Sequence, residues 1–231
     1  MKKLTLIFIA LILVMGTGFA QKNADKPKKI VKAAYFDETP PLRDMKIILP
    51  GERDRSWKDN IIPNESLDKN LDKKYGPKDA VTPEAQEIFG DRGSRGPVEN
   101  FDGVGNVNGV YPPDTDGDVG PDHYFQMINL SFAIFDKTGE LLYGPVDNST
   151  LWNGFIGPWT GTNDGDPVVL YDEEADRWVA TQFAVNLSNG KSYELVAVSQ
   201  TPDPMGEYYR YAFEFDQMND YPKVGVWNDG Y

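Results

Sequence analysis

The amino-acid sequence contains no cysteine and only one histidine, His123. Disulfide bonds and a lipid anchor on a cysteine are therefore excluded. Zinc sites that need several cysteines or histidines are excluded for the same reason. A catalytic triad would have to use His123, but its neighbours Tyr124 and Phe125 indicate a residue packed at the start of a strand. The sequence also lacks a phosphate-binding loop and a dinucleotide-binding fingerprint.

Long apolar runs are absent except for one near the N-terminus, Leu4–Met15. This run follows the basic pair Lys2–Lys3 and precedes small residues at Gly18 and Ala20. That order is typical of a cleavable secretory signal peptide, here residues 1–20. The run is short for a membrane span, which disfavours the alternative of a retained anchor. We expect a secreted or cell-surface protein with no integral membrane segment after cleavage.

Positive charge is scarce in the second half of the chain. Residues 101–231 contain 21 Asp or Glu and 5 Lys or Arg, which gives 5 − 21 = −16, against −13 for the whole chain. An acidic surface repels nucleic acid and anionic lipid, so neither is an expected partner. It suits hard cations such as Ca²⁺, although such acidity can also serve solubility alone.

The chain changes character near residue 100. Residues 21–99 are rich in Lys, Asp, Asn and Pro, which predicts a polar, partly disordered linker or pro-region. From residue 100 onward, aromatic and β-branched residues form short runs separated by turn residues, the pattern of antiparallel strands. Three hairpins are predicted, spanning residues 123–143, 168–185 and 193–215. The predicted fold class is all-β.

A faint repeat suggests how the strands are grouped. Pro121, Pro167 and Pro222 each stand just before a predicted strand, 46 and 55 residues apart. Repeats of about 40–50 residues with four strands each are typical of β-propeller blades. We therefore expect an incomplete, propeller-like array of four-stranded blades over residues 100–231, truncated at its C-terminus. The alternative is a β-sandwich, whose strands are also evenly spaced.

The loop Asp114-Thr-Asp116-Gly-Asp118 is the strongest local signal for a metal. Alternating carboxylates in a glycine-containing loop can direct several oxygens to one point, as Ca²⁺ requires. The spacing is not that of an EF-hand. A plain Asp/Gly turn would explain the same residues. The predicted calcium ligands are acidic residues of this loop and of two later ones: Asp114, Asp116, Asp118, Asp122 and Asp164.

Asp118, Asp166 and Asp220 each precede a predicted strand start. On a propeller axis such carboxylates would converge, raise one another's pKa and act as acid and base on a glycosidic bond. The alternative is that each accepts hydrogen bonds from backbone N–H groups where a strand begins. Any catalytic assignment is therefore limited to these three residues.

Trp152 and Trp159 lie in a loop rich in Gly, Asn and Thr, residues 153–164. Exposed aromatic side chains stack on sugar rings, whereas buried ones fill a core. Because of their position in a loop, these two residues are the predicted ligand contacts.

Three segments carry a resemblance to known proteins: residues 112–124, residues 163–178, which read NDGDPVVLYDEEADRW, and residues 219–227. With these motifs the chain resembles a group of uncharacterised secreted bacterial proteins with a propeller-like fold. Members of that group commonly continue beyond the point where this chain ends, often into adhesive or sorting modules.

A weaker likeness is to propeller glycosidases of the arabinanase and xylosidase type. It consists of Asp166-Pro-Val-Val169 and of the turn Ser199–Gly206, which is two residues longer here than in those enzymes. This likeness implies shared blade architecture more than shared catalysis.

Three functions remain open on the sequence. The first is a non-catalytic extracellular module, stabilised by calcium, that binds a glycan or a surface protein. The second is a polysaccharide-degrading enzyme, a glycosidase or lyase. The third is a structural domain of a larger surface protein.

Overall fold

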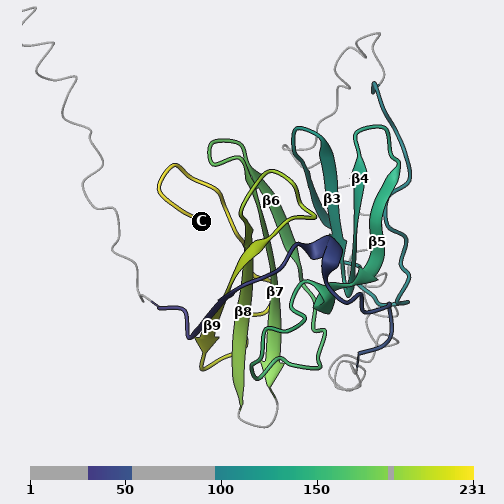
Figure 1. The fold of residues 1–231 in the computed structure, drawn as a ribbon. Coiled ribbons are helices and arrows are strands. Elements are labelled where there is room, and N and C mark those ends of the chain that lie inside the picture. Colours follow the sequence, from purple (N-terminus) through teal and green to yellow (C-terminus); the bar gives the residue numbers. More distant parts are fainter. Residues whose placement is uncertain (1–30, 54–96, 187–189) are drawn as a thin grey trace, which may run out of the picture. The chain divides into compact units, whose positions relative to one another are not determined.

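The computed structural model describes residues 31–53, 97–186 and 190–231. The predicted signal peptide and most of the predicted linker lie outside these residues. The chain divides into two units, Met1–Lys32 and Ala33–Tyr231. The second unit is all-β and contains two antiparallel sheets, which confirms the predicted fold class at that level (Figure 1).

The smaller sheet is a meander of four strands in the order β2-β3-β4-β5. These strands are β2 (Asp116–Val119), β3 (His123–Ile128), β4 (Ser131–Asp136) and β5 (Leu141–Asp147). The predicted hairpin over residues 123–143 is confirmed, with Phe125 opposite Ile134. Its second turn is fixed by Asp136, whose Oδ1 accepts the N–H groups of Thr138 and Glu140 at 2.8 Å each.

The larger sheet has five strands in the order β1-β9-β8-β7-β6. Four of them form a second consecutive meander: β6 (Val168–Asp172), β7 (Arg177–Asn186), β8 (Lys191–Ser199) and β9 (Tyr208–Phe215). Both hairpins that the sequence predicts in this region are confirmed. The fifth strand, β1 (Tyr35–Glu38), comes from the segment predicted as linker and pairs with β9.

The segment after β1 crosses to the smaller sheet. It contains the 3-10 turn η1 (Leu42–Asp44), and the Leu42 side chain is fully buried. Further along, the N–H of Asp147 donates to the carbonyl of Ile48 at 2.9 Å. Residues 33–49 therefore connect the two sheets.

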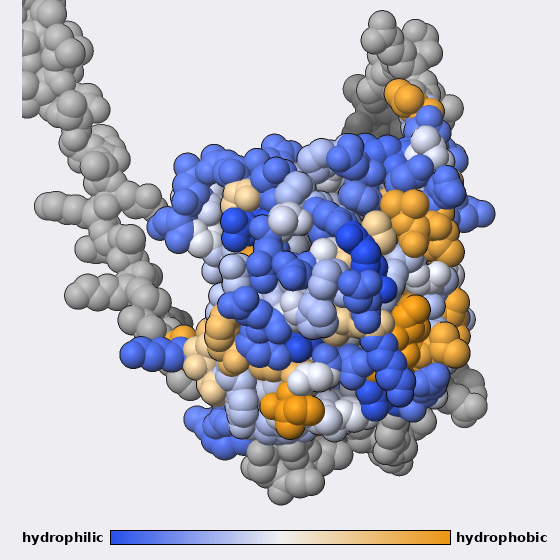
Figure 2. Space-filling model, viewed as in Figure 1, coloured by the Kyte–Doolittle hydropathy of each residue, from blue (hydrophilic) through white to orange (hydrophobic). Residues whose placement is uncertain are grey.

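One hydrophobic core joins the inward faces of both sheets. Alternate residues of each strand point into it, as the twofold period of a strand requires. Trp178 of β7 is fully buried, and its ring centroid lies 5.8 Å from that of Phe125 in β3. Outside the core, hydrophilic side chains predominate on the face in Figure 2, and hydrophobic ones form separate patches.

The two sheets meet most closely at β2 and β6, the first strand of each meander. Asp116 accepts the backbone N–H of Val169 at 3.0 Å, and Asp118 accepts that of Tyr171 at 2.8 Å. Carboxylates on one face of β2 therefore satisfy N–H groups along the edge of β6 that β7 does not use.

The predicted repeat is wrong in phase. Pro121 lies between β2 and β3, within the smaller sheet, whereas Pro167 directly precedes β6, the first strand of the larger sheet. The residues in equivalent positions before the two sheets are Asp114 and Asp166. Each lies two residues before the first strand of its meander, and each has a positive φ, 37° and 48° respectively. The segment from Pro222 forms no strand within the described residues and has only a bridge at Trp227.

Candidate functional site

The loop between β5 and β6 begins with a capped turn. Asp147 precedes the 3-10 turn η2 (Asn148–Thr150), and its carboxylate accepts the N–H of Ser149 at 2.9 Å. Asp147 is 2% exposed. Burial raises the pKa of its carboxyl, and the hydrogen bonds from Ser149 act in the opposite direction. This cap fixes the direction in which the loop leaves β5.

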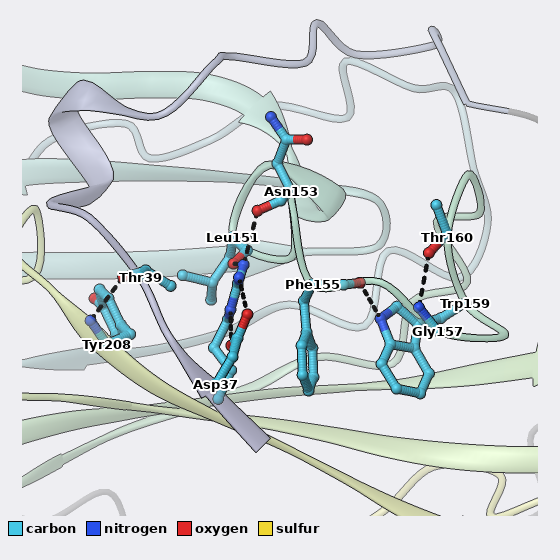
Figure 3. Close-up of polar contacts among 10 residues, drawn as sticks. Asp37, Thr39, Leu151, Asn153, Phe155, Gly157, Trp159, Thr160 and Tyr208 are labelled. Atoms are coloured by element: carbon cyan, nitrogen blue, oxygen red, sulfur yellow. Dashed lines mark hydrogen bonds and ion pairs between the residues drawn. The ribbon is translucent and has the colours of Figure 1, made fainter. Parts of the chain in front are cut away.

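Arg210 of β9 anchors the loop from the opposite sheet. Its guanidinium donates to both carboxylate oxygens of Asp37, at 2.9 and 2.7 Å. It also donates to the carbonyls of Leu151 and Asn153, both at 2.9 Å. Its Cζ lies 5.1 Å from the ring centroid of Phe155. Figure 3 shows Asp37, Leu151 and Asn153 converging on this group, with Phe155 beside it.

The two tryptophans predicted to contact a ligand are both buried, with Trp152 at 4% and Trp159 at 3% exposure. Trp159 donates its indole N–H to the carbonyl of Phe155 at 2.9 Å (Figure 3). Its ring lies 4.9 Å from Phe155 and 5.4 Å from Tyr193. Neither ring offers a face to solvent, so the structure gives both residues a packing role.

Both tryptophans nevertheless border a small cavity between this loop and β7 and β8. Its volume is about 30 Å³, room for one or two water molecules. The wall includes the Ser149 and Thr160 side chains and, on the strands, Gln182 and Leu195. Among the described residues, the indole N–H of Trp152 and Oε1 of Gln182 find no hydrogen-bond partner. Two residues that line the cavity therefore each carry a buried polar atom without a partner.

In this structure the carboxylates of the predicted calcium loop accept hydrogen bonds from protein groups. Besides their contacts with β6, Asp116 and Asp118 each accept the N–H of the following residue, at 3.0 and 2.8 Å. Asp114 accepts the side-chain amide of Asn129 at 2.5 Å. Each of these carboxylates therefore already has a hydrogen-bond donor.

The other two predicted ligands lie in different surroundings. Asp122 is exposed in the turn between β2 and β3. Asp164 is fully buried and accepts the N–H of Val185 at 2.9 Å and the hydroxyl of Thr162 at 3.1 Å. Over residues 31–53, 97–186 and 190–231, no three His, Cys, Asp or Glu form a group suited to a metal. Calcium at Asp114, Asp116, Asp118, Asp122 and Asp164 stays a prediction.

The three carboxylates considered for catalysis also differ in their surroundings. Asp166 is 8% exposed and accepts the N–H of Tyr221 at 3.2 Å. Asp118 is half-buried and binds the edge of β6, and Asp220 is exposed. Two of the three thus accept backbone N–H groups, but these belong to the middle of β6 and to the C-terminal segment rather than to the start of a strand.

Comparison with known proteins gives no relative. No protein-family model matches the chain, and no curated protein or solved structure matches it either. The resemblance to secreted propeller-like proteins stays a prediction. In the portions of the chain that the structure describes, no helix is long and apolar enough to cross a membrane.

Sequence reasoning missed two charged residues inside apolar strands. Arg210 stands in the run Tyr208–Phe215 and is 2% exposed. Glu194 stands in Lys191–Ser199 and is 9% exposed. A charge within a run of strand-forming residues is the signal that could have found both, because such residues are rarely buried without a partner.

Proposed function

We propose that this protein is a secreted or cell-surface β-propeller-like module that binds extracellular glycans and is stabilised by calcium. The N-terminal basic and apolar pattern supports export. Two consecutive four-stranded meanders with adjacent first strands support a blade-like arrangement, because a propeller repeats such sheets around an axis.

The observation that carries the glycan proposal is the cavity beside Trp152. A sugar hydroxyl both donates and accepts, so one such group matches an indole N–H and an amide oxygen. The cavity holds about 30 Å³, which suits an exocyclic hydroxymethyl group rather than a whole ring. A terminal hexose would place that group in the cavity and its ring against the rim of the loop.

The test is binding of the mature chain to an array of neutral and charged glycans. Trp152→Phe removes only the N–H donor, and Gln182→Leu removes the acceptor. We expect each to weaken binding of a neutral hexose about five- to tenfold, since a hydrogen bond contributes about 1 kcal/mol. Ile156→Ala is the matched control, because Ile156 is 72% exposed in the same loop and does not line the cavity.

Two outcomes would count against this function. Absence of binding to any glycan would contradict the proposed function. Binding that both cavity variants leave unchanged would show that the glycan binds elsewhere on the surface. Release of reducing sugar from a polysaccharide would instead support the enzyme alternative, with Asp118, Asp166 or Asp220 as the residues to substitute first.

A further inference from the structure

The outer face of the larger sheet carries aromatic side chains where β1 pairs with β9. Phe36 lies opposite Tyr211 in this ladder, and Glu38 lies opposite Tyr209. Residues that lie opposite each other share one face of a sheet. Arg210, between the two tyrosines, is buried on the inner face, so Phe36, Tyr209 and Tyr211 stand together on the outer one. We call these three residues the β1–β9 aromatic group.

The three rings of this group lie against one another and are open to solvent. The ring centroid of Phe36 lies 5.1 Å from that of Tyr211 and 6.3 Å from that of Tyr209. The rings of Phe36 and Tyr209 are inclined by only 22°. Phe36 is 55% exposed, and both tyrosines are half-buried. The face of an aromatic ring carries negative charge density, so an exposed group of rings attracts cations.

Two carboxylates flank the aromatic group. Glu38 is exposed on the same face. Glu207 is exposed two residues before Tyr209, and its carbonyl accepts the N–H of Gln200, so the pairing of β8 with β9 continues to it. The twofold period of a strand therefore places Glu207 on the outer face as well. Within the described residues, neither glutamate takes part in an ion pair.

We propose that the β1–β9 aromatic group, together with Glu38 and Glu207, binds the arginine side chains of a basic polypeptide segment. A guanidinium can lie flat on an aromatic ring while its N–H groups reach a carboxylate. An anionic partner would be repelled by both glutamates and by the acidic charge of residues 101–231. Charge complementarity therefore favours a cationic partner. This surface is separate from the cavity beside Trp152, and it does not depend on glycan binding.

The test measures binding of the mature chain to a peptide of arginine and glycine, by calorimetric titration at about 0.15 M salt. The same peptide with citrulline in place of arginine keeps the side-chain shape without the charge, and should bind at least about tenfold more weakly. Phe36→Leu keeps an apolar side chain and removes the ring, so it should weaken binding about three- to fivefold. Glu38→Gln should weaken binding about two- to fivefold.

Matched controls separate this surface from general attraction to an acidic protein. Asp122→Asn removes one charge at an exposed turn of the smaller sheet, and Ile156→Ala removes an exposed apolar side chain outside the aromatic group. Both should leave the affinity unchanged. Trp152→Phe should do the same, so this proposal and the glycan proposal fail independently. Glu38 is exposed, so Glu38→Gln tests the surface even where Phe36→Leu loosens β1.

Three results would overturn the proposal. One is absence of binding, or equal affinity for the arginine and citrulline peptides. Another is an equal loss of affinity in Glu38→Gln and Asp122→Asn, which would indicate attraction by net charge alone. The third is binding of a neutral glycan that Phe36→Leu abolishes, which would make the aromatic group a sugar-stacking surface instead.

Discussion

Arg210 introduces a full charge into the inner face of β9, where 2% of its surface is exposed. Its guanidinium is satisfied by Asp37 and by the carbonyls of Leu151 and Asn153. We predict that Arg210→Met lowers the free energy of unfolding by about 2–4 kcal/mol, because it unpairs Asp37 and two carbonyls. Urea unfolding measures this.

Arg43→Met is the control for that substitution. Arg43 pairs with Asp203 at the surface, where its side chain is 48% exposed, so its loss should change stability by less than about 0.5 kcal/mol. Equal effects of the two substitutions would show that the buried network does not hold the loop.

Glu194 makes stability depend on pH. Burial raises its pKa to about 8 from an ordinary 4.5, and the hydroxyl of Thr181 and the amide of Asn219 lower it only in part. The charged group that faces it is Asp166, which raises the pKa further. The folded protein therefore holds this proton more tightly than the unfolded chain does.

The sign of the effect follows from that difference. The stabilisation from Glu194 is complete below pH 4.5 and is lost as the pH rises towards 8. We expect wild-type protein to lose more stability than Glu194→Gln between pH 5 and pH 8, as measured by urea unfolding. Parallel pH profiles of the two proteins would contradict this.

At the scale of strands, the contact between β2 and β6 depends on side chains rather than on a ladder of backbone bonds. Asp118→Ala leaves the N–H of Tyr171 without its acceptor, so we expect a loss of about 1–2 kcal/mol. Asp118→Asn keeps an acceptor oxygen and should cost less than half as much. Asp122→Ala, at an exposed position, should be neutral by urea unfolding. Equal costs for the alanine and asparagine variants at Asp118 would contradict this role.

The strands were predictable because their signals are local. The alternation of apolar and polar residues, together with the turn residues, correctly predicted all three hairpins. One of them is formed by β6 and β7 around the turn Asp172–Asp176. The first strand of the smaller sheet was missed, since Asp116–Val119 carries one apolar residue and reads as a loop. Its carboxylates fit a strand only because β6 supplies N–H groups, a long-range contact that no local pattern contains.

The site was harder to predict for the same reason. Trp152 and Trp159 were correctly placed in a loop, but the carbonyl of Leu151 in that loop is bound by Arg210, which is more than 50 residues away and pairs with Asp37. β1 was placed in a linker because four residues, Tyr35–Glu38, show no more than a weak strand signal. Its pairing with β9 is again a contact between distant parts of the chain.

At the scale of the whole molecule, the shared core predicts that both sheets unfold together. Trp178 contacts Tyr171 within its own sheet and Phe125 in the other, and its indole N–H donates to Pro202 at 2.9 Å. We expect far-UV circular dichroism and tryptophan fluorescence to give coincident transitions, as in a two-state domain. Trp178→Ala should lower the free energy of unfolding by about 3–5 kcal/mol and move both transitions equally. Separate transitions would mean that each sheet is stable without the other, and the core between them would then contribute little to the fold.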